Sequence, residues 1–129
     1  MNDKIVCIID DDKVIQFTSK KMIELTGMAK EIMSFTDGEK AYEYLLNNAH
    51  NVELLPDILL VDINMPYMDG WEFLDKYETI RSGFPKKIII YMVSSSISEE
   101  ETNKAKAYTD VKDFLIKPVP KDKYLDILR

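Results

Sequence analysis

Four polar positions along the chain carry side chains suited to phosphoryl chemistry. Each follows or ends a short apolar run rich in Val and Ile, and they are Asp10-Asp11, Asp62, Ser94 and Lys117. If these runs are strands of one parallel sheet, the four positions converge, because open parallel sheets bind ligands outside the carboxyl ends of their strands. Three carboxylates, a hydroxyl and an ammonium in one crevice suit a divalent cation, a phosphoryl group and the charge between them.

The acidic triplet Asp10-Asp11-Asp12 directly follows the first apolar run. Like charges this close repel one another, and a hard divalent cation offsets the repulsion. Mg²⁺ takes oxygen ligands from one or two protein carboxylates and keeps several waters, which leaves room for phosphate oxygens. A helix N-cap in an acidic turn is the other interpretation of the triplet, and Asp12 suits it.

The other three positions offer a nucleophile and two groups that stabilise negative charge. Asp62 ends a wholly apolar stretch, and a carboxylate there could attack phosphorus to form an aspartyl phosphate. Ser94 has a hydroxyl that can donate to an anionic oxygen, and Lys117 has a compact positive charge suited to phosphate. Each also has an ordinary explanation, namely a turn, a loop or cap, and a solvated side chain. Their shared place at predicted strand ends favours one site.

The elements that must position these residues are strands alternating with helices. Residues 5–9, 58–61 and 88–93 are nearly continuous apolar runs, typical of strands buried on both faces of a parallel sheet. Residues 30–35 and 111–116 are more mixed, so we place those strands nearer the edges.

Segments with apolar residues at helical spacing separate the strands. The first is marked by Val14, Phe17, Met22 and Leu25, and the others cover residues 41–46, 71–80 and 98–108, with a short last helix from 118–120 to the chain end. Ser98 can cap the fourth helix. This alternation predicts a doubly wound α/β fold with five parallel strands, five helices and right-handed crossovers.

Length and composition predict one soluble domain over residues 1–129. The net charge of −6 disfavours nonspecific binding to nucleic acid. The single Cys7 has no partner for an intramolecular disulfide, which fits a reducing compartment, so we expect a cytoplasmic protein. The N-terminus lacks the features of a secretory signal, and no apolar run approaches the roughly 20 residues that cross a bilayer, so we expect no membrane association.

With these residues placed, the chain resembles the receiver domain of two-component response regulators, of the single-domain type of the chemotaxis protein CheY. The resemblance covers essentially the whole chain, and four segments carry it: IIDDD at residues 8–12, VDINMPYMDG at 61–70, MVSS at 92–95 and FLIKP at 114–118. It implies the flavodoxin-like strand order 2-1-3-4-5.

The resemblance also implies a role for each site residue. Asp62 would be the phosphoacceptor, receiving a phosphoryl group from a phosphohistidine on a sensor histidine kinase or phosphotransfer protein. Asp11 would ligate Mg²⁺ directly and Asp10 through water, with Asp62 and the backbone carbonyl of Asn64 as further ligands. Lys117 would pair with the phosphoryl group or with Asp62. Such a domain is not a conventional enzyme, although it assists its own phosphorylation and dephosphorylation.

The same resemblance implies a switch that a downstream protein target reads. Ser94 would move to bind the phosphoryl group, Phe114 would turn inward, and the output face would comprise the fourth helix, fifth strand and fifth helix. Asn64 and Ser96 would tune dephosphorylation, and the Lys117-Pro118 bond would be cis, as is common in the family. The protein would be a monomer or a phosphorylation-dependent dimer.

Three alternatives stay open. A haloacid dehalogenase phosphatase also uses a strand-end aspartate, but it needs a second acid where this chain has Asn64. A pseudo-receiver binds partners without phosphorylation, although such proteins typically lose an acidic or Lys position, and none is lost here. The chain could also be a receiver fragment of a longer regulator with an effector domain. We assign Trp71 to a packing or surface role, His50 to a loop and Cys7 to the core.

Overall fold

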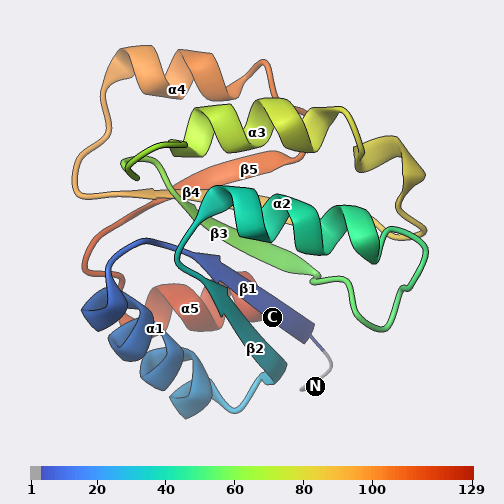
Figure 1. Cartoon of the computed structure of the whole chain (residues 1–129). Coiled ribbons are helices and arrows are strands. Elements are labelled where there is room, and N and C mark those ends of the chain that lie inside the picture. Colours follow the sequence, from blue (N-terminus) through green and yellow to red (C-terminus); the bar gives the residue numbers. More distant parts are fainter. Residues whose placement is uncertain (1–3) are drawn as a thin grey trace.

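Five parallel strands form the sheet at the centre of the structure. The computed structural model describes residues 4–129, and its strands are β1 (Lys4–Ile9), β2 (Ala29–Phe35), β3 (Ile58–Asp62), β4 (Ile89–Ser94) and β5 (Val111–Ile116). Neighbouring strands are parallel in the order β2-β1-β3-β4-β5, which confirms the predicted sheet and its two edge strands (Figure 1). Residues 1–3, which begin the segment predicted to lack a secretory signal, lie outside the described residues.

Helices cover both faces of the sheet. They are α1 (Lys13–Thr26), α2 (Gly38–Asn47), α3 (Gly70–Glu78), α4 (Glu99–Ala105) and α5 (Lys121–Leu128), with one 3-10 turn, η1 (Arg81–Gly83), after α3. α1 and α5 lie on one face, and α2, α3 and α4 lie on the other (Figure 1). Between residues 4 and 129, none of the helices combines the length and the apolarity that a membrane crossing requires.

The core has two layers, because successive strand residues point to opposite faces of the sheet. Ile9 and Val61 belong to the layer under α2, α3 and α4, whereas Ile8 and Leu60 belong to the layer under α1 and α5. Two buried faces require apolar residues at every position of the central strands, which explains their continuous apolar runs. Cys7 lies in the first layer, as predicted, and burial raises the pKa of its thiol.

α1 differs from its prediction in the face that it buries. Val14, Phe17 and Leu25 are 71%, 62% and 65% exposed, although their spacing was part of the reason to predict a helix. The residues that α1 buries are Gln16, Ser19 and Ile23. Two of these three are polar, so the apolar pattern does not follow the face that packs on the sheet. The helix itself is confirmed, with Asp12 as its N-cap and Gly27 as a left-handed C-cap at φ 67°.

α4 is shorter than the predicted segment 98–108. Its start is confirmed, since Ser98 and Glu101 form a capping box. After Ala105 the chain continues in tight turns, where the Lys106 N–H donates to the Asn103 carbonyl at 3.2 Å and the Tyr108 N–H donates to Ala105 at 3.0 Å. The regular helix therefore ends three residues before Tyr108.

Candidate functional site

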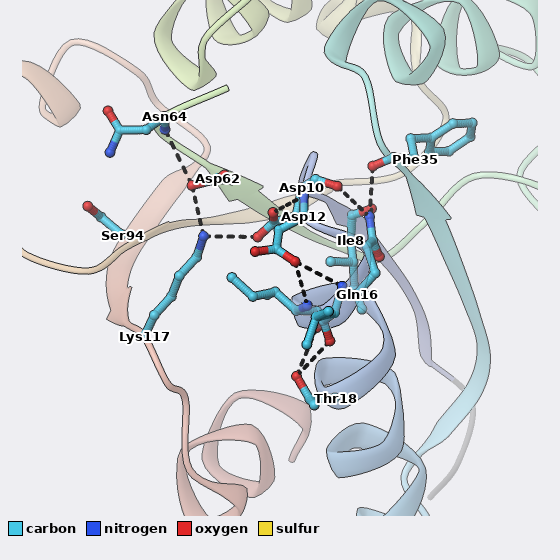
Figure 2. Close-up of polar contacts among 12 residues, drawn as sticks. Ile8, Asp10, Asp12, Gln16, Thr18, Phe35, Asp62, Asn64, Ser94 and Lys117 are labelled. Carbon is cyan, nitrogen blue, oxygen red and sulfur yellow. Dashed lines mark hydrogen bonds and ion pairs between the residues drawn. The ribbon is translucent and has the colours of Figure 1, made fainter. Parts of the chain in front are cut away.

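The four predicted positions meet at the carboxyl ends of four strands. Asp10 follows β1, Asp62 and Ser94 are the last residues of β3 and β4, and Lys117 follows β5. The Lys117 Nζ lies 3.0 Å from Asp10 Oδ2 and 3.1 Å from Asp62 Oδ1, so one ammonium bridges two strand ends (Figure 2). The convergence expected from the sheet topology is present in the structure.

Three carboxylates form an acidic cluster around this lysine. One carboxylate oxygen from each of Asp10, Asp11 and Asp62 lies within 4.8 Å of the others. Asp10 and Asp62 are buried, whereas Asp11 is exposed at the mouth of the crevice. Asp12 turns away from the cluster, and its Oδ1 accepts hydrogen bonds from Val14 N at 2.8 Å and Ile15 N at 3.2 Å. The triplet therefore divides into two residues that face the site and one helix cap.

The electrostatics of the cluster favour an added cation. Burial, and after it the charge of Asp10, raise the pKa of Asp62 to about 6 against the opposing effect of Lys117. Burial opposes the ammonium charge of Lys117, but its hydrogen bonds to Asp10 and Asp62 raise its pKa above the ordinary value. With all four groups ionised, three carboxylates face one ammonium, and the excess negative charge suits a hard divalent cation with oxygen ligands.

The loop after β3 is held close to the site by its backbone. The Asn64 N–H donates to Asp62 Oδ1 at 3.3 Å, and the Gly70 N–H donates to the Ile63 carbonyl at 2.9 Å. A Cβ added at Gly70 would lie 2.7 Å from the Asp62 carbonyl oxygen, closer than real Cβ atoms come. Gly70 is therefore required here, because it lets the start of α3 approach the end of β3.

Ser94 lies at the site but does not face Asp62. Its hydroxyl donates to the Ser96 carbonyl at 2.8 Å, within its own loop. The Lys117 N–H donates to the Ser94 carbonyl at 2.8 Å, which ties the ends of β4 and β5 together, and the Lys117-Pro118 bond is cis. Phe114 is half-buried and packs against the core layer under α2, α3 and α4.

A largely apolar cavity opens beside the site, between α1 and α5. Its volume is about 590 Å³, and Ile8, Leu60 and Tyr124 line it together with Asp10, Asp62 and Lys117. The carboxylates and the ammonium thus lie against apolar walls, which is the physical setting that keeps water away from Asp62 and raises its pKa.

Two residues that the sequence placed outside the chemistry lie apart from the cluster. Trp71 is buried against Tyr108, with ring centroids 5.9 Å apart, which confirms its packing role. His50 is exposed in the loop after α2.

One residue near the site had no sequence signal. Gln16 is buried beneath the Asp10-Asp11 turn and contacts its backbone, yet a single glutamine in a helix carries no motif. Its place on the buried face of α1, shared with Ser19 and Ile23, becomes visible only in the structure.

Comparisons with known proteins give the family of the chain. The family model described as "Response regulator receiver domain" matches residues 6–129. The "Probable methanogenesis regulatory protein FilR2" of Methanothrix harundinacea is 26% identical over 115 residues, which cover 89% of this chain and 72% of that protein. The chain spans 29% to 48% of the length of the next curated relatives that it matches.

Solved structures share the fold over nearly the whole length. A two-component response regulator from Cytophaga hutchinsonii has a TM-score of 0.86 at 30% identity, covering 99% of this chain and 95% of that one. The Vibrio cholerae chemotaxis protein CheY4 has a TM-score of 0.79 at 25% identity, covering 97% of this chain and 95% of that one. With the strand order and the family match over residues 6–129, the chain belongs to the response regulator receiver domain family of two-component signalling.

Proposed function

We propose that this receiver domain is a Mg²⁺-dependent phosphoacceptor switch. Asp62 receives a phosphoryl group from a phosphohistidine on a sensor histidine kinase or phosphotransfer protein. The observation that carries the proposal is the cluster of three carboxylates with Lys117 bridging Asp10 and Asp62. That combination serves a metal, a nucleophile and a phosphoryl group at once.

The residues present fit Mg²⁺. Asp11, exposed at the mouth, would supply a direct ligand. Asp10 would act through water, because both of its oxygens already accept hydrogen bonds, Oδ2 from Lys117 at 3.0 Å and Oδ1 from Asp12 N at 2.9 Å. Asp62 and the backbone carbonyl of Asn64 complete the protein ligands. When bound, Mg²⁺ supplies positive charge that offsets the phosphoryl oxygens.

Phosphoryl transfer to Asp62 forms one bond to phosphorus and breaks another. An Asp62 oxygen attacks phosphorus, and the phosphorus–nitrogen bond of the phosphohistidine breaks. The bonding electron pair returns to the ring, which leaves as neutral imidazole when its other nitrogen is protonated. Lys117, 3.1 Å from Asp62 Oδ1, stabilises the charge that builds on the phosphoryl oxygens.

Exposed apolar residues near the site offer a contact surface for the phosphodonor. Val14 and Phe17 lie in the first turns of α1, directly after the acidic turn, and both are more than half exposed. Apolar side chains beside a phosphorylation site suit a protein donor, because exposed apolar surface marks interaction sites.

Phosphorylation then gives the Ser94 hydroxyl a new hydrogen-bond acceptor. Its hydroxyl now donates to the neutral Ser96 carbonyl at 2.8 Å. An anionic phosphoryl oxygen on Asp62 is a stronger acceptor, because hydrogen bonds to ionised groups are roughly twice as strong. Ser94 moves toward it, Phe114 turns inward, and the face of α4, β5 and α5 changes for a downstream protein. Asn64 and Ser96 tune the loss of the phosphoryl group by orienting water.

The same proposal concerns the extent and the cellular location of this receiver domain. Residues 1–129 act as one receiver domain in the cytoplasm, as a monomer or a phosphorylation-dependent dimer, without direct contact with nucleic acid or membrane. A pseudo-receiver, or a receiver that belongs to a longer regulator with an effector domain, is the competing assignment. The chain covers only 29% and 48% of two longer relatives, which favours the longer regulator over the pseudo-receiver as the alternative.

The experiment that tests the proposal is intact-mass measurement after incubation with phosphoramidate or acetyl phosphate, with and without Mg²⁺. We expect the wild type to gain one phosphoryl group only when Mg²⁺ is present. Asp62→Ala should gain none, because it lacks the nucleophile. Asp122→Ala, which removes an exposed carboxylate on α5, is the matched control and should label like the wild type.

A wild type that gains no phosphoryl group, under conditions that label another receiver, would favour the pseudo-receiver assignment. Labelling that persists in Asp62→Ala would instead place the phosphoacceptor elsewhere.

A further inference from the structure

Gln16 makes an unusual set of contacts with the backbone under the acidic turn. Its Nε2 donates toward three carbonyl oxygens, at 3.3 Å for Ile8, 3.0 Å for Asp10 and 2.8 Å for Phe35 (Figure 2). The carboxamide lies where β1 and β2 end, and the residue is only 9% exposed. One side chain of α1 thus holds the carbonyls of two strand ends.

The other half of the same carboxamide is unpaired. Among residues 4–129, the Gln16 Oε1 is the buried side-chain atom without a hydrogen-bond partner. An unsatisfied buried acceptor destabilises the fold, because it has lost its hydrogen bonds to water without gaining others. A helix that packs on a sheet would avoid this cost with an apolar residue, so the donor end of the amide must compensate for it.

The carbonyl that Gln16 holds at Asp10 belongs to the peptide that joins Asp10 to Asp11. Its direction decides where both side chains leave the backbone. The rest of Asp10 is also held, because its N–H donates to the Phe35 carbonyl at 3.0 Å and its Oδ1 accepts from Asp12 N at 2.9 Å. Gln16 therefore fixes the one backbone group of Asp10 that these two bonds leave open.

We propose that Gln16 is a positioning residue for the cation site, orienting the Asp10-Asp11 peptide so that both carboxylates face Asp62. The proposal rests on the proposed function, since it assumes a divalent cation at that cluster. Gln16 does not ligate the cation. It acts through the Asp10 carbonyl, much as outer-shell partners orient metal ligands in other sites.

The test compares Mg²⁺ affinity, measured by isothermal titration calorimetry on the unphosphorylated chain, across variants of this residue. Gln16→Leu and Gln16→Met remove the donors without adding charge, and the unbranched Met packs where Leu does not. We expect either variant to raise the Mg²⁺ dissociation constant about 10-fold, the lower end of the usual cost of losing an outer-shell partner. Thr18→Val, on the exposed side of the same helix, is the control and should bind like the wild type.

Two charged variants separate positioning from simple electrostatics. Gln16→Lys keeps donors but adds positive charge, and Gln16→Glu adds negative charge but faces the three carbonyls with acceptors. Positioning predicts that Gln16→Lys binds Mg²⁺ more tightly than Gln16→Glu. Long-range electrostatics alone predicts the opposite order, because an added negative charge attracts the cation.

The proposal is overturned if a folded Gln16→Leu or Gln16→Met binds Mg²⁺ within twofold of the wild type, or if the charged variants follow electrostatics. Asp11→Asn shows which proposal has failed. If the wild type binds Mg²⁺ no more tightly than Asp11→Asn, the cation site itself is wrong and Gln16 has nothing to position. If Asp11→Asn weakens binding and the Gln16 variants do not, only the role of Gln16 is wrong.

Discussion

At the scale of single residues, the site concentrates groups that a stable fold would avoid. Asp62 is buried at a strand end beside a second buried carboxylate, Asp10, and Lys117 is the one cation paired with them among residues 4–129. The consequence is the pKa of about 6 for Asp62, above its ordinary value near 4. Such a carboxylate is ionised at neutral pH, as a nucleophile must be, but its ionisation costs stability.

Because ionisation of buried Asp62 opposes folding, the stability of the protein should depend on pH. Because the pKa of Asp62 is raised in the folded state, the folded protein binds more protons than the unfolded chain between about pH 4 and 6, and stability falls as pH rises through that window. We therefore expect Asp62→Asn to be more stable than the wild type at pH 7, by about 2 kcal/mol, in urea denaturation without Mg²⁺. The advantage should shrink toward pH 4, where the wild-type carboxylate is protonated.

The matched control for this measurement is Asp122→Asn, which changes an exposed carboxylate and should shift the free energy of unfolding little. An Asp62→Asn variant that is less stable than the wild type at pH 7 would mean that its contact with Lys117 outweighs its burial.

At the scale of elements, the site depends on how closely α3 approaches the end of β3. Gly70 is the first residue of α3, and its N–H donates to the Ile63 carbonyl at 2.9 Å. The space for a Cβ is taken by backbone, at 2.7 Å for the Asp62 oxygen and 2.9 Å for the Ile63 Cα. Backbone atoms cannot rotate away as a side chain can, so the two elements would have to separate.

Gly70→Ala is therefore expected to lower the free energy of unfolding by about 1–3 kcal/mol, as overpacking does. Because Asp62 is the residue displaced, labelling by phosphoramidate should also slow. Gly83→Ala is the control, since a Cβ there meets nothing within 4 Å. Urea denaturation measures the free energy of unfolding of both variants. Equal values for Gly70→Ala and Gly83→Ala would mean that α3 moves away from β3 without loss of stability.

At the scale of the whole molecule, the sequence predicted the architecture and the meeting of the site residues, but not the details of packing. The central strands were recognisable because two buried faces leave only apolar residues between residues 5 and 9 and between 58 and 61. The face of α1 was not, because Gln16 and Ser19 are polar and buried while Phe17 is apolar and exposed. Apolar residues at helical spacing predict a helix with one apolar face. The spacing does not show whether that face packs on the sheet or is left exposed for a partner.

Within the site, strand ends could be predicted and side-chain directions could not. The topology brings Asp10, Asp62, Ser94 and Lys117 to one edge of the sheet whatever their rotamers. The hydrogen bond from the Ser94 hydroxyl to the Ser96 carbonyl depends on the Ser94 rotamer, which the sequence does not determine. The contacts of Gln16 depend on where α1 sits on the sheet, a tertiary property without a local pattern.

The end of the sheet opposite the site carries a second buried charge cluster with a different consequence. Arg81 donates to Asp110 through Nη2 at 2.8 Å and Nε at 2.9 Å, and the Tyr77 hydroxyl donates to the same carboxylate at 3.1 Å. The Arg81 guanidinium lowers the pKa of Asp110 below its ordinary value. No carboxylate competes for this arginine in the contacts of residues 4–129, so the cluster stabilises the fold where the Asp62 cluster strains it.

Arg81→Leu is expected to destabilise the protein by about 2 kcal/mol at pH 7, because it leaves a buried carboxylate without its charged partner, partly discounted for the exposure of the arginine. Since the pKa of Asp110 is lowered in the folded state, this contribution is present above the ordinary pKa near 4 and is lost as pH falls through the folded value. Lys21→Ala removes an exposed pair with Glu24 and should change stability little. If Arg81→Leu also weakened Mg²⁺ binding in a folded protein, the two ends of the sheet would be coupled, and the Arg81–Asp110 cluster would not act on stability alone.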